Sequence, residues 1–183
     1  NHQFSFYMKQ KTSYKNNLIS LLDQTYPGIN DFFDSPARSD GSQKWVDFVS
    51  SFWHVDCVRS LGLATFTERY QKWCKRHGYN FQPEKPAQIY SFSKELISVF
   101  TKDSVTKFLV KQAVEQLNTV SFTVEQLRLE MNRLAAQLPE YQVVMAMKGV
   151  GPSLGPQLMA EIGDLSRFSH REALTAFAGV DPG

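Results

Sequence analysis

The sequence lacks the marks of several protein classes. Its 183 residues include two cysteines, Cys57 and Cys74, whose spacing fits neither a disulfide framework nor a zinc site. No apolar run approaches the length of a transmembrane helix, and the N-terminus has no signal-peptide pattern, so no membrane association is expected. These absences predict a cytoplasmic protein with two buried thiols.

The sequence also has a small net charge and few strand-like patterns. Twenty basic residues against 18 acidic residues leave a net charge of only +2, so any nucleic-acid surface must be a local patch. The alternation of apolar and polar residues that is typical of strands is rare, whereas helix caps are frequent. A hydrophobic content of 42% is enough to bury a core. The predicted fold class is therefore all-α.

Three helices are predicted in the first half of the chain. The first covers about residues 4–25 and carries lysines that we interpret as a solvated face. A Ser/Asp/Gly/Pro-rich loop at 35–42 precedes the second, whose expected core face consists of Trp45, Phe48, Val49, Phe52 and Trp53. Thr65 and Glu68 match a capping box, which predicts the start of a third helix that ends at Gly78.

A change of pattern follows Pro83 and Pro86, which mark a boundary before a short helix predicted around residues 94–100. Beyond it, apolar residues repeat every seven positions in two registers: Val110, Leu117, Val124, Met131 and Leu138, and Ala113, Val120, Leu127 and Leu134. This seam predicts a long coiled-coil helix. Thr119, Ser121 and Thr123 are weak helix formers, so a local bend or a break into an antiparallel pair is an alternative to one continuous helix. The seam's partner is either another segment of this chain or a second protomer.

The stretch from 141 to 179 is the most informative about function. Two short helices are predicted there, separated by Lys148, Gly149, Val150, Gly151 and Pro152. Gly149 stops the first helix, Ser153 is the expected N-cap of the second, and Pro156 falls in its first turn. The pattern resembles the helix-hairpin-helix module of DNA-binding proteins, although such a hairpin can also merely close two packed helices.

The hairpin suggests a phosphate-binding surface. Glycines let the backbone approach a phosphate, a helix N-terminus attracts it, and a lysine adds positive charge. A further capping box begins at Ser169, so Arg167, His170 and Arg171 are expected near a helix start. The candidate DNA-binding residues are Lys148, Gly149, Val150, Gly151, Ser153, Arg167, His170 and Arg171. No residue is predicted to be catalytic or to bind metal.

Four segments resemble one family: KNNLISLLDQTYPG at 15–28, KWVDFVSSFWH at 44–54, the stretch from 138 to 168, and ALTAFAGVDPG at 173–183. They are similar to the insertion-sequence transposases of the IS110 group, which pair a RuvC-like DEDD domain with a C-terminal serine domain. By this resemblance, 1–86 is the helical region after the DEDD domain, 87–139 a helix plus coiled coil, and 140–183 the helix-hairpin-helix start of the C-terminal domain.

The resemblance implies a bacterial, nucleoid-associated recombinase for DNA transposition. DNA would be its substrate, a structured guide RNA from the element a second partner, and the coiled coil a means of homo-oligomerisation. The family's four acidic ligands of a divalent metal, expected to be Mg²⁺, should precede Asn1, and its nucleophilic serine should follow Gly183. We therefore expect a fragment without cofactor or catalytic activity. The alternatives are a non-catalytic helix-hairpin-helix DNA-binding module and a coiled-coil scaffold.

Overall fold

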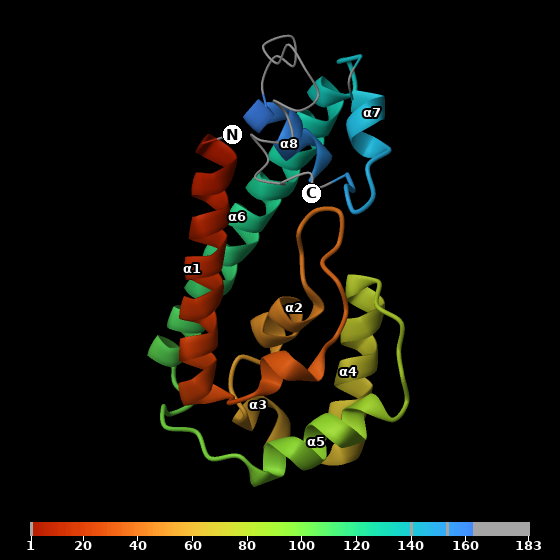
Figure 1. Cartoon of the computed structure of the whole chain (residues 1–183). Helices are drawn as coiled ribbons and strands as arrows, with labels where there is room; N and C mark the ends of the chain where they lie inside the picture. The colour runs from red at the N-terminus through yellow and green to blue at the C-terminus, as the bar shows by residue number, and fades with distance from the viewer. Residues whose placement is uncertain (1, 140, 153, 163–183) are drawn as a thin grey trace, which may run out of the picture. The chain divides into compact units, whose positions relative to one another are not determined.

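The computed structural model describes residues 2–139, 141–152 and 154–162. Its elements are α1 (His2–Thr25), the 3-10 helix η1 (Ile29–Phe32), α2 (Lys44–Ser51), α3 (Asp56–Arg59), α4 (Leu63–His77), α5 (Lys85–Glu95), α6 (Ser104–Ala135), α7 (Tyr141–Met145) and α8 (Gly155–Ile162) (Figure 1). The described residues contain helices and no strand, which confirms the all-α prediction. None of these helices has the length and apolar character needed to span a bilayer.

Contacts between Cα atoms divide the chain into two compact units. Residues 5–125 form the first, here called the helical body. The described residues of 2–4 and 126–162 form the second, here called the hairpin unit, and α6 supplies residues to both. Each unit is described by itself below. The domain boundaries after residues 86 and 139 stay predictions.

Aromatic side chains form the centre of the helical body. Phe48 is fully buried, and its ring centroid lies 5.1 Å from that of Phe33, 4.7 Å from that of Phe52 and 5.6 Å from that of Trp73. Such pairs add to the free energy gained by burying their large apolar surfaces. The core face predicted for the second helix is confirmed, although Phe52 and Trp53 lie just beyond the end of α2.

Two helix boundaries in the helical body differ from the prediction. α4 begins at Leu63 after Gly62, so the expected capping box at Thr65 lies inside the helix. Its end at Gly78 is confirmed, because the Gly78 N–H donates to the last carbonyls of the helix with φ at 67°. The helix predicted at 94–100 is wrong: α5 spans Lys85–Glu95 and has Pro86 in its first turn.

The long helix α6 runs for 32 residues without a break. The Thr119 and Thr123 hydroxyls donate to carbonyls four residues earlier, at 2.9 and 3.0 Å, so the weak helix formers are accommodated within it. The first part of the predicted seam is buried: Val110, Ala113, Leu117, Val120 and Val124. All of these except Val124 belong to the core cluster of the helical body, so this half of the seam packs within its own chain.

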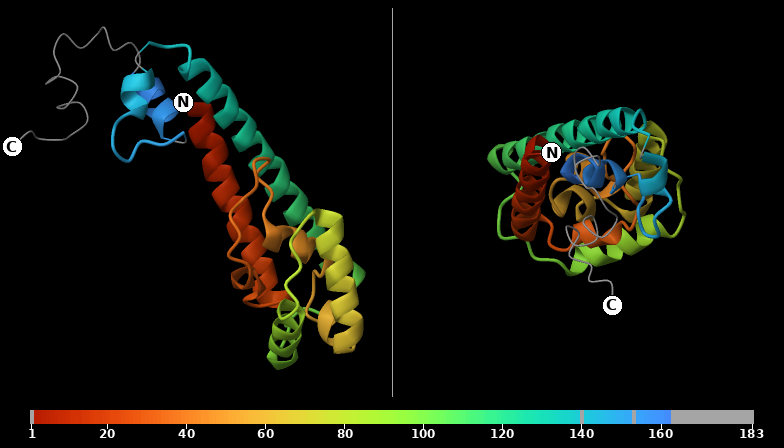
Figure 2. Two further views of the ribbon diagram at one scale, coloured as in Figure 1. Left: turned by 90° about the vertical axis from the view of Figure 1, so that its right-hand side faces the viewer. Right: turned by 45° about the horizontal axis from the view of Figure 1, so that its top comes forward.

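α1 and α6 cross each other within the helical body, as the right-hand view of Figure 2 shows. Leu18 and Leu22 of α1 are fully buried in the same core as the first half of the seam. The Lys11 ammonium and the Glu125 carboxylate are 3.8 Å apart across the two helices. Farther along, Leu134 and Leu138 are 51% and 44% exposed. The first part of the seam is thus buried, whereas side chains of its last part are about half exposed. The coiled coil itself stays a prediction.

Candidate nucleic-acid interface

The hairpin predicted at 148–152 joins two short helices in the structure. α7 ends at Met145, and the chain then makes two successive turns before α8 begins at Gly155. The Val150 N–H donates to the Met147 carbonyl at 3.1 Å, and the Gly155 N–H donates to the Gly151 carbonyl at 2.9 Å. Backbone hydrogen bonds therefore hold both sides of the turn, and Pro156 falls in the first turn of α8 as expected.

Gly149 adopts the left-handed conformation that the sequence predicts. Its φ is 88°, which is strained for any residue with a Cβ atom. Gly151 has no such constraint, and a Cβ atom on either glycine would meet none of the described residues within 4 Å. The backbone of both glycines is therefore open to an approaching group, and only Gly149 requires glycine for its conformation.

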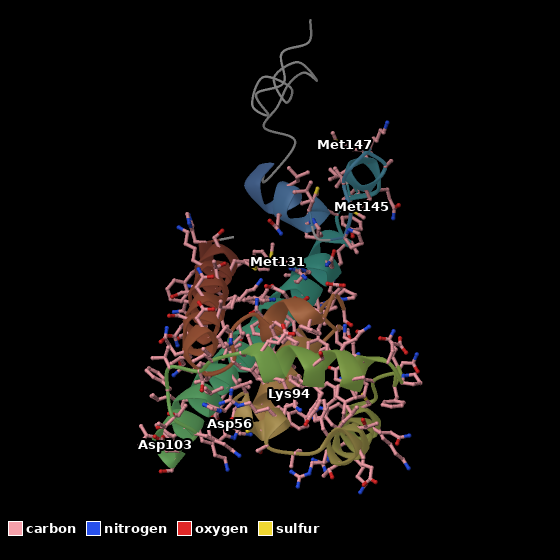
Figure 3. The ribbon with its side chains drawn as sticks, turned by 90° about the horizontal axis from the view of Figure 1, so that it is seen from below. Asp56, Lys94, Asp103, Met131, Met145 and Met147 are labelled. Carbon is pink, nitrogen blue, oxygen red and sulfur yellow. The ribbon has the colours of Figure 1, made fainter. Side chains whose placement is uncertain are left out.

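A small apolar cluster holds the two helices together. Val144 of α7 and Met159 of α8 are 5% and 4% exposed and pack with Ala135 at the end of α6. A Cβ atom on Gly155 would lie 2.5 Å from the Met145 Sδ atom, so α7 and α8 approach closely at this glycine. Met145 thus faces α8, whereas Met147 is 54% exposed (Figure 3). Gly155 was not among the predicted site residues, and its only signal in the sequence is the Gly-Pro pair that it forms with Pro156.

The predicted DNA-binding residues fall into two groups. Lys148 and Gly149 are exposed and Val150 and Gly151 are half-buried, and all four belong to the same turn. Lys148 is the one charged side chain that the structure describes between residues 141 and 159. Ser153, Arg167, His170 and Arg171 lie outside the described residues. The candidate interface as described is therefore a glycine turn bearing one lysine.

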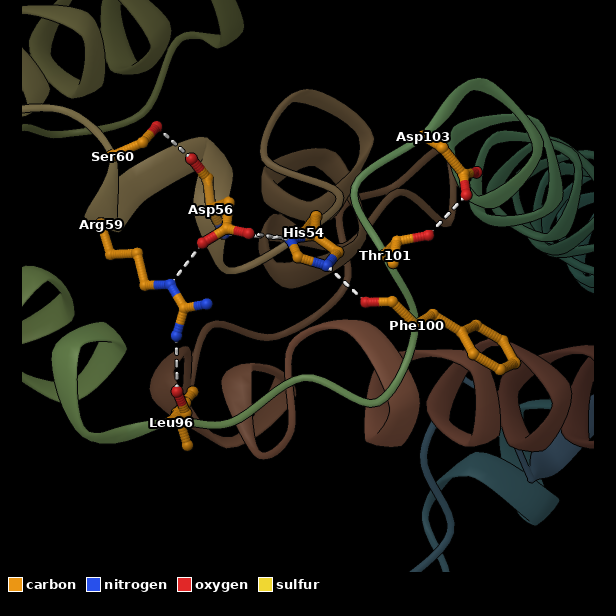
Figure 4. Close-up of polar contacts among 8 residues, drawn as sticks. All are labelled: His54, Asp56, Arg59, Ser60, Leu96, Phe100, Thr101 and Asp103. Atoms are coloured by element: carbon orange, nitrogen blue, oxygen red, sulfur yellow. Dashed lines mark hydrogen bonds and ion pairs between the residues drawn. The ribbon is translucent and has the colours of Figure 1, made fainter.

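A polar cluster in the helical body includes a histidine, an aspartate and a serine (Figure 4). His54 is fully buried; its Nδ1 atom accepts the Asp56 N–H at 3.0 Å, so Nε2 carries the proton and donates to the Phe100 carbonyl at 2.9 Å. The Ser60 hydroxyl donates to the Asp56 carbonyl and does not contact His54. Both ring nitrogens are engaged with the backbone, so this arrangement lacks the base and nucleophile geometry of a hydrolase.

The same cluster fixes the connection between α5 and α6. The Arg59 side chain pairs with Asp56 and donates to the Leu96 carbonyl at 2.7 Å. At the start of α6, the Asp103 carboxylate accepts the Thr101 hydroxyl at 2.6 Å and the Thr106 N–H at 2.8 Å. The hydrogen bond from Thr101, followed by that from Thr106, holds the pKa of Asp103 below its ordinary value. These contacts make Asp103 the N-cap of α6.

A comparison with protein-family models is informative for the hairpin. Residues 141–183 match the model described as "Transposase IS116/IS110/IS902 family". The C-terminal segment matches a transposase family. The match begins at the first residue of α7 and includes α8, so it covers the glycine turn. It supports an IS110-type transposase and a role in transposition, and through the family it suggests DNA binding.

No curated protein and no solved structure matches the chain. The DEDD domain and the serine domain that the resemblance implies are therefore not confirmed. Within the described part of the chain, no three His, Cys, Asp or Glu side chains gather closely enough to hold a metal ion. The described residues therefore offer no set of ligands for the divalent metal that the resemblance implies.

Proposed function

We propose that this chain contributes DNA binding and subunit assembly to an IS110-type transposase. The observation that carries the proposal is the position of the family match, which coincides with α7, the glycine turn and α8. Transposition requires the protein to hold DNA. The glycine turn has the features by which a backbone meets phosphate: a left-handed glycine, open space and a lysine.

The contact would be with the DNA backbone rather than with base edges. Gly149 and Gly151 have no side chain to shield their amides, and no atom of the part of the chain that the structure describes lies within 4 Å of the position of a Cβ on either. Lys148 is exposed beside them and can neutralise one phosphate. Contacts of this kind position a protein on DNA without reading sequence. A guide RNA has the same backbone phosphates, so RNA is proposed as a second ligand and a competitor.

Assembly would use the exposed half of the seam. Leu134 and Leu138 continue the heptad pattern of α6 and are about half exposed, whereas the earlier seam positions from Val110 to Val120 are buried in the core of the helical body. An a/d seam is stabilised when its apolar residues pack against those of another helix. A second copy of the chain would offer the same residues, and this favours a homo-oligomer.

The phosphate contact can be tested by following the binding of a fluorescent DNA duplex by anisotropy over a range of salt concentrations. We expect binding at low salt that weakens steeply as salt rises. Lys148→Gln should reduce the slope of log K against log salt by about 0.9, because the protein then neutralises one phosphate fewer. Lys9→Gln removes an equally exposed lysine from α1 and serves as the control. A slope unchanged by Lys148→Gln would remove Lys148 from the interface.

A further inference from the structure

A pocket of about 280 Å³ opens on the helical body, away in sequence from the glycine turn. Three separate segments form it: the end of η1 with the chain after it, the first residue of α2, and the start of α5 with the chain before it. Its lining consists of Phe32, Phe33, Asp34, Ser35, Lys44, Gln82 and Lys85. Pockets with aromatic walls and a few convergent polar groups are typical ligand sites. None of these residues belongs to the proposed DNA interface.

Two lysines converge on this pocket. Lys44 is the first residue of α2 and Lys85 the first residue of α5. Their ammonium groups each lie 5.7 Å from the centroid of the Phe33 ring. Within the described residues, neither lysine forms an ion pair with a carboxylate. The arginines Arg59 and Arg133, in contrast, each pair with a nearby acidic side chain.

Electrostatics in the pocket favour an anion. Burial lowers the pKa of Lys44, and the positive charge of Lys85 lowers it further, so the two cations disfavour each other. No side chain hydrogen-bonds the N-terminus of α2 or of α5, but Glu84 precedes α5 and Asp47 lies in the first turn of α2, so these carboxylates offset the helix dipoles in part. The positive charge of the pocket therefore comes from its two lysines. Asp34 is the one acidic residue in the lining, against two lysines. A bound anion would offset this excess of positive charge.

The other polar groups of the lining indicate which anion fits. The Ser35 hydroxyl and the Gln82 amide can donate hydrogen bonds, and a lysine ammonium offers up to three more. Several donors around a compact negative group suit a tetrahedral phosphate, for which lysine is a common protein ligand. We propose that this pocket binds a phosphate group through Lys44 and Lys85. The phosphate belongs either to a nucleic-acid backbone or to a small free phosphate compound.

The test compares two double variants of the whole chain. Lys44→Gln with Lys85→Gln removes both pocket charges, and Lys9→Gln with Lys15→Gln removes two exposed lysines from α1. Inorganic phosphate is titrated by calorimetry at low ionic strength, and a DNA duplex by anisotropy over a range of salt. Thermal melting verifies that both variants fold. The pocket variant should bind at least one of the two probes at least tenfold more weakly than the control.

The two probes distinguish the source of the phosphate. If the pocket variant binds inorganic phosphate more weakly and its DNA salt slope is unchanged, the pocket is assigned to a small phosphate compound. A reduced DNA salt slope in the pocket variant, but not in the control, assigns it to a nucleic-acid backbone. If both probes bind the pocket variant as they bind the control, the proposal is overturned. The pocket proposal is independent of the glycine turn. The two are tested by different substitutions, because Lys148→Gln leaves both pocket lysines unchanged.

Discussion

Among the glycines of the helical body, Gly41 is the one where an added Cβ atom would meet the closest contact. Its φ is 83°, and a Cβ atom there would lie 2.7 Å from the Ser121 carbonyl oxygen on α6. Backbone cannot move aside as a flexible side chain can. Gly41 also donates its N–H to the Arg38 carbonyl at 2.9 Å, within the loop that precedes α2. The loop can therefore lie against α6 only while this residue has no side chain.

Gly41→Ser should destabilise the helical body by roughly 2 kcal/mol or more, because it adds both left-handed strain and a backbone clash. Gly62→Ser is the matched control. Gly62 has φ at −69°, open space around it and the N-cap position of α4, where serine is favoured. Its effect should be near zero or stabilising. Urea unfolding followed by circular dichroism measures both, and equal stabilities for the two variants would contradict the structure.

The hairpin shows which residue roles can be predicted from sequence. Gly149 was identified because a glycine that ends an apolar helical run commonly adopts a left-handed conformation, a local property. Gly155 was missed because its role depends on the Met145 side chain of another helix. Such a contact between elements leaves no periodic signal. The pocket around Lys44 and Lys85 was missed for the same reason, since residues about 40 positions apart form it.

At the scale of elements, α6 was the most predictable and α5 the least. The heptad pattern of α6 extends over many turns, so its helix was evident from the sequence. α5 has Pro86 in its first turn, and treating the prolines only as a boundary displaced the predicted helix toward the C-terminus. The segment after α5 is held by Arg59 and His54, through hydrogen bonds to the Leu96 and Phe100 carbonyls that sequence alone does not reveal.

The exposed half of α6 leads to a prediction about assembly. Leu134→Asp places a charge on the seam at a side chain that is 51% exposed, so the unassembled chain should still fold while the oligomer dissociates to monomers. Leu129→Asp is the control, because Leu129 is 58% exposed on the same helix but outside both heptad registers. Light scattering gives the mass of each. An oligomer that survives Leu134→Asp would place the assembly surface elsewhere.

At the scale of the whole molecule, the fold class and the most informative stretch could be predicted from the sequence. The all-α fold follows from helical periodicity and capping, and the family match falls on the stretch that resembled a helix-hairpin-helix module. The division into a helical body and a hairpin unit depends on contacts between distant residues, and the sequence did not indicate it. Within the hairpin unit, the proposed contact is between the glycine turn and a nucleic-acid phosphate.

The affinity of the Gly151→Ala variant for a DNA duplex tests the contact between the glycine turn and phosphate. The new methyl group meets no atom of residues 2–139, 141–152 or 154–162 within 4 Å and needs no strained φ, so the fold should persist, as thermal melting can verify. The methyl group would nevertheless occupy the space that an approaching phosphate needs. Gly62→Ala adds the same group at an open glycine of the helical body. We predict weaker duplex binding at low salt for Gly151→Ala alone; equal binding by both variants would contradict the proposed interface.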